Sequence, residues 1–445
     1  MSFAELGLAP QVLKAVAEQG YENPTPIQAE AIPVILAGRD VLGAAQTGTG
    51  KTAAFTLPIL TLLAPHASTS VSPARHPLRA LVLTPTRELA DQVYANVDAY
   101  SKHLPLRSTV AFGGTDINTQ IPTLRKGVEV LVATPGRLLD HVQQKTVNLA
   151  TVEILVLDEA DRMLDMGFMP DIRRIMALLT SRKQTLLFSA TFSPEIKKMA
   201  ADFLHNPQTI EVARQNSTNE SVKQELHPVE PFRKKGLLAH LIRTHEMTQV
   251  IVFCRTKIGA DQVCRDLKRD GFSVEAIHGD RAQSARTETL AAFKGGSLRV
   301  LVATDVAARG LDISDLPFVV NYDLPTNPED YVHRIGRTGR AGATGVAISF
   351  VTPDDDKSFE LIKKLIKKDL QLIPVPGFSP GTKPLAAPAS ARAPASTAAS
   401  MAAVPRAALT GSTSIQPPES RNFAPRPKQI AALFLPPKAP VKAAE

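Results

Sequence analysis

The chain has 445 residues, of which 44% are apolar and 21% charged, as in most globular proteins. That length exceeds one ordinary core and predicts two or three folded units. No window holds the roughly eighteen consecutive apolar residues of a membrane helix, so no membrane association is expected, and the most apolar stretch, 52–65, predicts a buried helix. Two cysteines without a His/Cys cluster argue against a disulfide framework or a zinc site. The opening MSFAELGLAP lacks the features of a secretory signal, so a cytoplasmic location is expected.

The net charge of +8 is unevenly distributed along the chain. From Pro380 onward the sequence has eight Lys and Arg residues against Glu419 and Glu445, so this segment holds most of the excess. The remainder is nearly neutral. Any nucleic-acid contacts in the folded part must therefore come from local clusters of basic residues rather than from a general positive field.

Short β-branched runs alternate with helical patterns along most of the chain, and apolar runs such as ILVL and VIVF are typical of parallel strands buried on both faces. The pattern predicts an α/β fold with two doubly wound parallel-sheet domains. The expected strands are 79–84, 108–112, 128–133, 154–157 and 185–188 in the first half, and 249–254, 274–277, 300–303, 319–322 and 346–350 in the second. The pentapeptide VLVAT occurs at 130–134 and again at 300–304, which favours a duplicated domain over chance similarity.

The predicted boundaries are domain 1 at 1–212, a polar linker at 213–222, domain 2 at 223–375 and a C-terminal tail at 376–445. Residues 358–370 place four apolar side chains on one helical face, as expected for the last helix of domain 2: Phe359, Ile362, Ile366 and Leu370. The tail is rich in Ala, Pro, Ser and Thr and is predicted to be disordered, because it cannot bury enough apolar surface to fold.

Residues 45–52, AQTGTGKT, follow an expected strand at 40–44 and open a helical pattern. Small residues let backbone amides turn toward phosphates, Lys51 can reach the β- and γ-phosphates, and the Thr52 hydroxyl can bind Mg²⁺. Ala45 stands where the general phosphate-loop pattern has Gly, so an ordinary Gly-rich turn remains the alternative.

Two further motifs complete a nucleotide site. Acids follow the apolar run 154–157, which places Asp158 at the carboxyl edge of a sheet, where it can hold Mg²⁺ while Glu159 polarises the attacking water. The glycine-rich HRIGRTGR at 333–340 carries arginines whose geometry suits a phosphate oxyanion, although such a loop could bind any polyanion.

The ordered motifs AQTGTGKT, DEAD at 158–161, SAT at 189–191 and HRIGRTGR resemble those of the DEAD-box helicases. GYENPTPIQ at 20–28, with Phe3 seventeen residues before Gly20, is similar to the family's adenine-reading Q motif. The other motifs of the family are also present: PTREL at 85–89, GG at 113–114, TPGR at 134–137, VFCR at 252–255, QSAR at 283–286 and ATDVAARGLD at 303–312. The resemblance therefore covers roughly residues 1–375. RMLDMGF at 162–168 and PEDYVHRIGRTGR at 328–340 look most like the bacterial RhlE subgroup.

This resemblance implies two tandem RecA-like domains that use ATP and Mg²⁺ to unwind RNA duplexes locally and to remodel RNA–protein complexes. Tyr21 would stack on adenine, and the Gln28 amide would pair with its N6 and N7 atoms. Arg337 and Arg340 would act as arginine fingers, with Lys51, Asp158 and Glu159 as the other catalytic residues. The implied ATP-binding set is Tyr21, Gln28, Ala45, Gln46, Thr47, Gly48, Thr49, Gly50, Lys51, Thr52, Gly310 and Asp312, with Thr52 and Asp158 as Mg²⁺ ligands.

The resemblance also implies residues that couple the nucleotide to the strand, namely Asp161, Ser189, Thr191 and His333. The expected contacts to the RNA backbone, which carry no sequence information, come from Arg87, Gly114, Thr134, Arg137, Arg255, Arg286 and Thr304. A monomer is expected, with single-stranded RNA and short duplexes as partners and with ribosomal or RNA-decay proteins as further ones. The alternatives are an ATP-gated RNA clamp or annealing factor, a DNA helicase of the wider superfamily, and a simple NTP switch or phosphotransferase.

Overall fold

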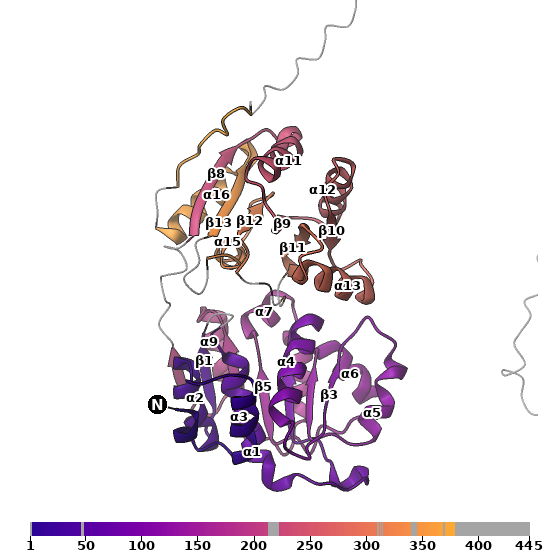
Figure 1. Cartoon of the computed structure of the whole chain (residues 1–445). Helices are drawn as coiled ribbons and strands as arrows, with labels where there is room; N and C mark the ends of the chain where they lie inside the picture. Colours follow the sequence, from indigo (N-terminus) through magenta and orange to yellow (C-terminus); the bar gives the residue numbers. More distant parts are fainter. Residues whose placement is uncertain are drawn as a thin grey trace, which may run out of the picture. The chain divides into compact units, whose positions relative to one another are not determined.

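The computed structural model describes residues 2–45, 49–211, 222–308, 311, 313, 315–339, 345–367 and 370–378. Two parallel sheets are formed, one from each half of the chain (Figure 1). The tail predicted at 376–445 lies outside the described residues except for its first three. Among the described residues, no helix has both the length and the apolarity needed to cross a membrane.

The first sheet has seven parallel strands in the order β3-β4-β2-β5-β6-β1-β7. They are β1 (Val41–Ala44), β2 (Ala80–Leu83), β3 (Ser108–Ala111), β4 (Val130–Ala133), β5 (Ile154–Leu157), β6 (Gln184–Ser189) and β7 (Gln208–Glu211). The helices of this half are α1 (Pro10–Glu18), α2 (Pro26–Leu36), α3 (Lys51–Leu63), α4 (Arg87–Ser101), α5 (Ile121–Arg125), α6 (Pro135–Gln143), α7 (Ala160–Asp165), α8 (Met169–Leu178) and α9 (Pro194–Phe203).

Both faces of this sheet are buried, as the apolar runs predict. Along β5, Ile154 and Val156 join the core formed with α1–α4, whereas Leu155 and Leu157 join the core formed with α6–α9. Successive side chains of a strand point to opposite faces, so a strand covered on both sides must be apolar throughout. The carboxyl ends of the strands then form one edge, where loops are free to carry function.

The second sheet has six parallel strands in the order β10-β11-β9-β12-β13-β8. They are β8 (Val222–Pro228), β9 (Val250–Cys254), β10 (Val274–Ile277), β11 (Val300–Thr304), β12 (Phe318–Asn321) and β13 (Gly345–Val351). The helices are α11 (Lys234–Thr244), α12 (Lys257–Arg269), α13 (Gln283–Lys294), α14 (Asp305–Ala308), α15 (Pro328–Ile335) and α16 (Asp356–Ile366). The α/β fold with two doubly wound parallel sheets is thereby confirmed.

Three details differ from the sequence-based expectation. Val222, assigned to the linker, is the first residue of β8, and the strands β7 and β8 were not predicted. Helix α16 ends at Ile366 rather than Leu370, because Lys367 adopts a left-handed conformation with φ of 54°. The chain then returns along the edge strand β8, where the Ile373 amide donates to the Leu226 carbonyl at 2.8 Å, and Phe378 still packs against the core around α11.

Candidate nucleotide and nucleic-acid site

The phosphate loop connects β1 to α3. Gly50 has a φ of 91°, and a Cβ placed there would lie 2.3 Å from Gln28 Nε2, so only glycine fits. Lys51 begins α3 and is buried, and its ammonium has no hydrogen-bond partner among the residues that the structure describes. Gln46, Thr47 and Gly48 lie outside the described residues.

Gln28 holds this loop from the side of α2. Its Oε1 accepts from the Thr25 amide at 2.9 Å, and its Nε2 donates to the Gly50 carbonyl at 3.1 Å. A carboxamide has two acceptor lone pairs and two N–H donors, so one of each remains for a ligand. Because one partner is an N–H and the other a carbonyl, the orientation of the amide is determined by the chain itself.

Asp158 and Glu159 directly follow β5. Burial raises the pKa of Asp158 to about 6, and the nearby Lys51 ammonium opposes that shift. Glu159 has a φ of 53°, a strained backbone conformation for a residue with a side chain. Its buried Oε2 accepts no hydrogen bond from the described residues and lies 3.5 Å from Arg162 Nε. Two carboxylates and one buried ammonium therefore meet at the carboxyl edge of the sheet.

Asp161 lies against the end of β6. Its Oδ2 accepts from the Ala190 amide at 3.1 Å, and the Ser189 hydroxyl donates to the Thr191 carbonyl at 2.8 Å. The DEAD segment and the SAT segment are thus joined through a backbone N–H between the two predicted residues, not through their hydroxyls. A movement of either segment would therefore displace the other through this hydrogen bond.

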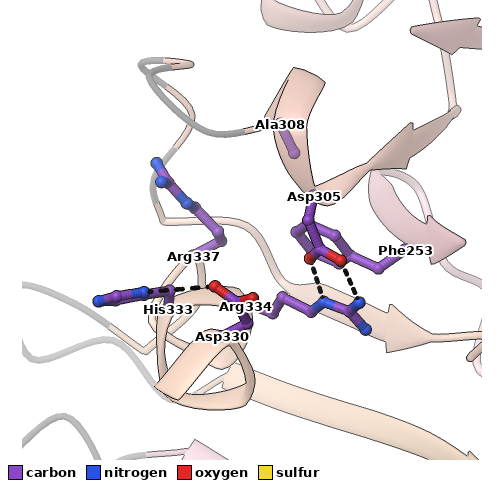
Figure 2. A pocket seen from close by; sticks show the side chains of 7 residues that line it. All are labelled: Phe253, Asp305, Ala308, Asp330, His333, Arg334 and Arg337. Atoms are coloured by element: carbon purple, nitrogen blue, oxygen red, sulfur yellow. Dashed lines mark hydrogen bonds and ion pairs between the residues drawn. The ribbon is translucent and has the colours of Figure 1, made fainter. Parts of the chain in front are cut away.

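The second half contributes the HRIGRTGR segment at the end of α15. Arg334 is buried and forms a two-pronged ion pair with Asp305, at 2.6 Å from Nε and 2.7 Å from Nη2, as Figure 2 shows. Its Nη1 donates to Asn321 Oδ1 at 3.0 Å, and the guanidinium lies over the Phe253 ring at 5.0 Å. Arg334 is therefore fully paired within the chain.

Two neighbouring predicted residues, Arg337 and His333, lie beside this pair. Arg337 points away from the Arg334–Asp305 pair (Figure 2), and its Nη1 donates to the Leu311 carbonyl at 2.8 Å. His333 Nδ1 lies 3.9 Å from an Asp330 carboxylate oxygen. Gly310, Asp312 and Arg340, which were predicted to complete this part of the site, lie outside the described residues.

Four of the predicted RNA contacts gather beyond β2, β3 and β4. The Arg87 guanidinium lies so close to Gly114 that a Cβ there would collide with it, and Gly114 has a φ of 86°. Thr134 follows β4 and donates its amide to Ala111, while Arg137 in α6 donates to the Thr115 carbonyl at 3.0 Å. One loop cluster at the sheet edge thus carries all four residues.

The other predicted RNA contacts have partners in the chain. Arg255 donates to Asp355 at 3.0 Å, and Thr304 ends β11. Arg286 is buried and pairs with Glu88 at 2.8 Å, and Gln283 donates to the same carboxylate at 3.1 Å. The two arginines could contact RNA only by exchanging or sharing these carboxylates.

Sequence reasoning missed Arg334 and Glu88. Arg334 is one of three arginines in a glycine-rich motif, and no local pattern separates the one that pairs with Asp305 from Arg337 and Arg340. Glu88 follows Arg87 in PTREL, but its partners are about 195 residues away in the sequence. Only a tertiary contact could have identified either residue.

Comparison with known proteins agrees with this geometry. A family model described as DEAD/DEAH box helicase matches residues 25–199, and one described as Helicase conserved C-terminal domain matches residues 233–342. Over 375 residues the chain is 44% identical to the ATP-dependent RNA helicase CshA of Limosilactobacillus reuteri, covering 84% of this chain and 73% of that protein. The DEAD-box ATP-dependent RNA helicase RhpA of Helicobacter pylori is also 44% identical over 375 residues, covering 84% and 74%.

The fold has solved counterparts as well. The structure of Dbp5 of S. cerevisiae bound to RNA and ADP BeF3 matches with a TM-score of 0.73 and 35% identity, over 84% of this chain and 95% of that one. This match confirms the RecA-like helicase architecture of both halves. The chain therefore belongs to the DEAD-box ATP-dependent RNA helicases, enzymes that hydrolyse ATP and bind RNA.

Proposed function

We propose that the chain hydrolyses MgATP at the site built from the phosphate loop and the DEAD segment, and uses it to release short RNA duplexes. The observation that carries this assignment is the buried Lys51 ammonium, which has no hydrogen-bond partner among the described residues and lies near Asp158. A buried cation is costly unless an anion satisfies it. A triphosphate supplies that anion.

The residues present fit a magnesium ion. The Asp158 carboxylate and the Thr52 hydroxyl would hold Mg²⁺, which supplies positive charge to the phosphate oxygens. Lys51 binds the β- and γ-phosphates, and Glu159 orients and polarises the attacking water through the Oε2 that accepts no hydrogen bond from the described residues. The remaining lone pair and N–H of Gln28 read the N6 and N7 edge of adenine, and Tyr21 stacks on its face.

The arginines of the second half complete the reaction. Arg337 and Arg340 stabilise the charge that develops on the γ-phosphate, with Gly310 and Asp312 touching the nucleotide. Arg337 must exchange the Leu311 carbonyl for a phosphate oxygen to do so. Closure of domain 2 (223–375) onto domain 1 (1–212), through the linker at 213–222, would then depend on ATP and RNA together.

The RNA backbone would lie along the cluster around Arg87, Gly114 and Arg137. Amide and guanidinium contacts to phosphates fix the position of a strand but do not read its sequence. Asp161, the SAT segment and His333 would couple the state of the nucleotide to these contacts with the RNA backbone. RMLDMGF and PEDYVHRIGRTGR support membership of the RhlE subgroup. The proposal also takes the chain to be a cytoplasmic monomer that works beside ribosomal or RNA-decay proteins.

A strand-release experiment tests the proposal. A short RNA duplex should separate with ATP and Mg²⁺, should separate far more slowly with GTP, and should not separate when Mg²⁺ is chelated. A DNA duplex of the same sequence should stimulate little ATP turnover. RNA binding without duplex release would support the ATP-gated clamp instead, and equal stimulation by DNA would support a DNA helicase.

A further inference from the structure

The Tyr21 ring lies beside Tyr100 of helix α4. The ring centroids of Tyr21 and Tyr100 are 6.5 Å apart and the rings are inclined by 59°. Tyr100 is 3% exposed and belongs to the core, whereas Tyr21 remains 49% exposed. Burial raises the pKa of Tyr100, and interaction with the Tyr21 side chain raises it further. A buried ring thus supports an exposed one.

The backbone of Tyr21 is fixed by the end of α1. Gly20 has a φ of 76°, its amide donates to the Ala17 carbonyl at 3.0 Å, and the Tyr21 amide donates to the Val16 carbonyl at 3.3 Å. This is the hydrogen-bond pattern of a helix C-terminus closed by a left-handed glycine. The position of the Tyr21 Cα is therefore determined by α1.

Two contacts tie α1 in turn to the end of α4. One carboxylate, Glu18, pairs with Lys102 at 2.8 Å and with His103 at 2.9 Å. Single exposed ion pairs contribute little to stability, but a carboxylate that contacts both Lys102 and His103 restricts the rotation of α1 against α4. Tyr100 lies two residues before Lys102 and three before His103, and its ring lies beside that of Tyr21.

We propose that Tyr100 is a positioning residue for the base of the nucleotide, because it holds the Tyr21 ring in place as a stacking platform. The proposal rests on the function proposed above, in which Tyr21 stacks on adenine. A ring with about half of its surface exposed and no support would sample several rotamers, and binding would have to restrict it. Support by Tyr100 removes that cost before the nucleotide arrives.

The test compares four variants of the full-length protein in steady-state ATPase assays at saturating RNA. Tyr21→Ala removes the platform, Tyr100→Leu removes the support, Tyr100→Phe keeps the ring without its hydroxyl, and Tyr94→Phe is a matched control on the same helix. Stacking of a base on an aromatic ring predicts a rise of about tenfold or more in the KM for ATP for Tyr21→Ala. Tyr100→Leu should raise KM about three- to tenfold with kcat within about twofold of wild type. Tyr100→Phe should fall between wild type and Tyr100→Leu, and Tyr94→Phe should match wild type.

A triphosphate without a base separates positioning from general destabilisation. The KM for ribose 5-triphosphate should be the same in all variants, because no base is present to stack. An unchanged ATP KM in Tyr100→Leu, beside a raised one in Tyr21→Ala, would overturn the supporting role and leave the proposed function intact. An unchanged KM in Tyr21→Ala would overturn the stacking assignment and this proposal with it. If Tyr100→Leu does not fold, Tyr100→Phe decides, since an increased KM for ATP in that variant would support the proposal and a wild-type KM would contradict the intermediate value that it predicts.

Discussion

Lys51 in the first half and Arg334 in the second half are both buried cations, but they have opposite surroundings. Every nitrogen of the Arg334 guanidinium has a partner, supplied by Asp305, Asn321 and the Asp323 carbonyl. The Lys51 ammonium has no hydrogen-bond partner among the described residues and lies near the Asp158 carboxylate. A satisfied buried charge maintains the fold, whereas an unsatisfied one is retained for a ligand.

Arg337 is a third buried cation, and its Nη1 donates to the backbone carbonyls of Leu311 and Ile313. Carbonyl acceptors can be exchanged for phosphate oxygens at a smaller cost than an ion pair. Arg337→Ala should therefore lower ATP turnover at least about 10³-fold, as expected of an arginine finger, with a smaller change in ATP affinity. Single-turnover hydrolysis and nucleotide titration measure the two quantities. Turnover at wild-type speed by residues 1–212 alone would refute a two-domain site.

Glu159 extends the comparison to a carboxylate whose buried Oε2 accepts no hydrogen bond from the described residues. Glu159→Gln should lower turnover about 10²- to 10⁴-fold, because the amide cannot polarise the attacking water, while ATP and RNA binding persist. The expected observation is a long-lived complex with ATP and RNA in a gel-shift or filter-binding assay. Loss of ATP binding in this variant would contradict the assigned role.

The Gln28 amide bonds Thr25 and Gly50 of the chain and keeps one donor and one acceptor for the proposed contact with adenine. Gln28→Ala should narrow the preference for ATP over GTP by about tenfold, because the adenine-matching amide is lost. Gln28→Glu should raise the KM for ATP as well, since a carboxylate cannot donate to Gly50. The ratios of kcat/KM for the two nucleotides give the answer. Wild-type protein that uses ATP and GTP equally would disprove adenine reading.

The smallest effect is expected from the basic tail. We expect residues 380–445 to tether RNA non-specifically, although a solubilising extension or a protein-docking segment at Ile430–Leu435 remains the alternative. Binding of single strands weakens with salt at a slope of about 0.7 per neutralised phosphate, so truncation at Pro380 should reduce the slope by roughly 2 to 3 if half of the eight cations engage. Saturated turnover should not change. Identical slopes for the two proteins would rule out tethering.

Much of the fold follows from the sequence because buried parallel strands must be apolar on both faces. The predicted strands match the structure to within about two residues, and α3 (Lys51–Leu63) is the buried helix expected from the apolar stretch. The strands β7 and β8 escaped prediction because both are edge strands. Their polar residues, as in VKQELHP of β8, interrupt the apolar pattern.

The site was predicted less completely than the fold. The motifs place Lys51 at the start of the helix that follows the phosphate loop, and Asp158 and Glu159 after the strand 154–157, where the structure has them. The sequence could not show that Gln28 is fixed by Thr25 and Gly50, since that depends on how α2 packs against the phosphate loop. The partners of Arg334 and the support of Tyr21 by Tyr100 likewise come from residues that are distant in the chain.

The free energy of unfolding of Lys51→Met and Arg334→Met, measured by urea titration without nucleotide, tests the distinction between the two cations most directly. Arg334→Met should lose about 3–5 kcal/mol, because Asp305 remains without its partner. Lys51→Met should be as stable as wild type or more stable, yet should gain no stability from MgATP, whereas saturating ligand stabilises wild type by about 3 kcal/mol at a hundred times its Kd. A loss of several kcal/mol in Lys51→Met without nucleotide would contradict the account, since it would show that Lys51 already has a partner within the fold.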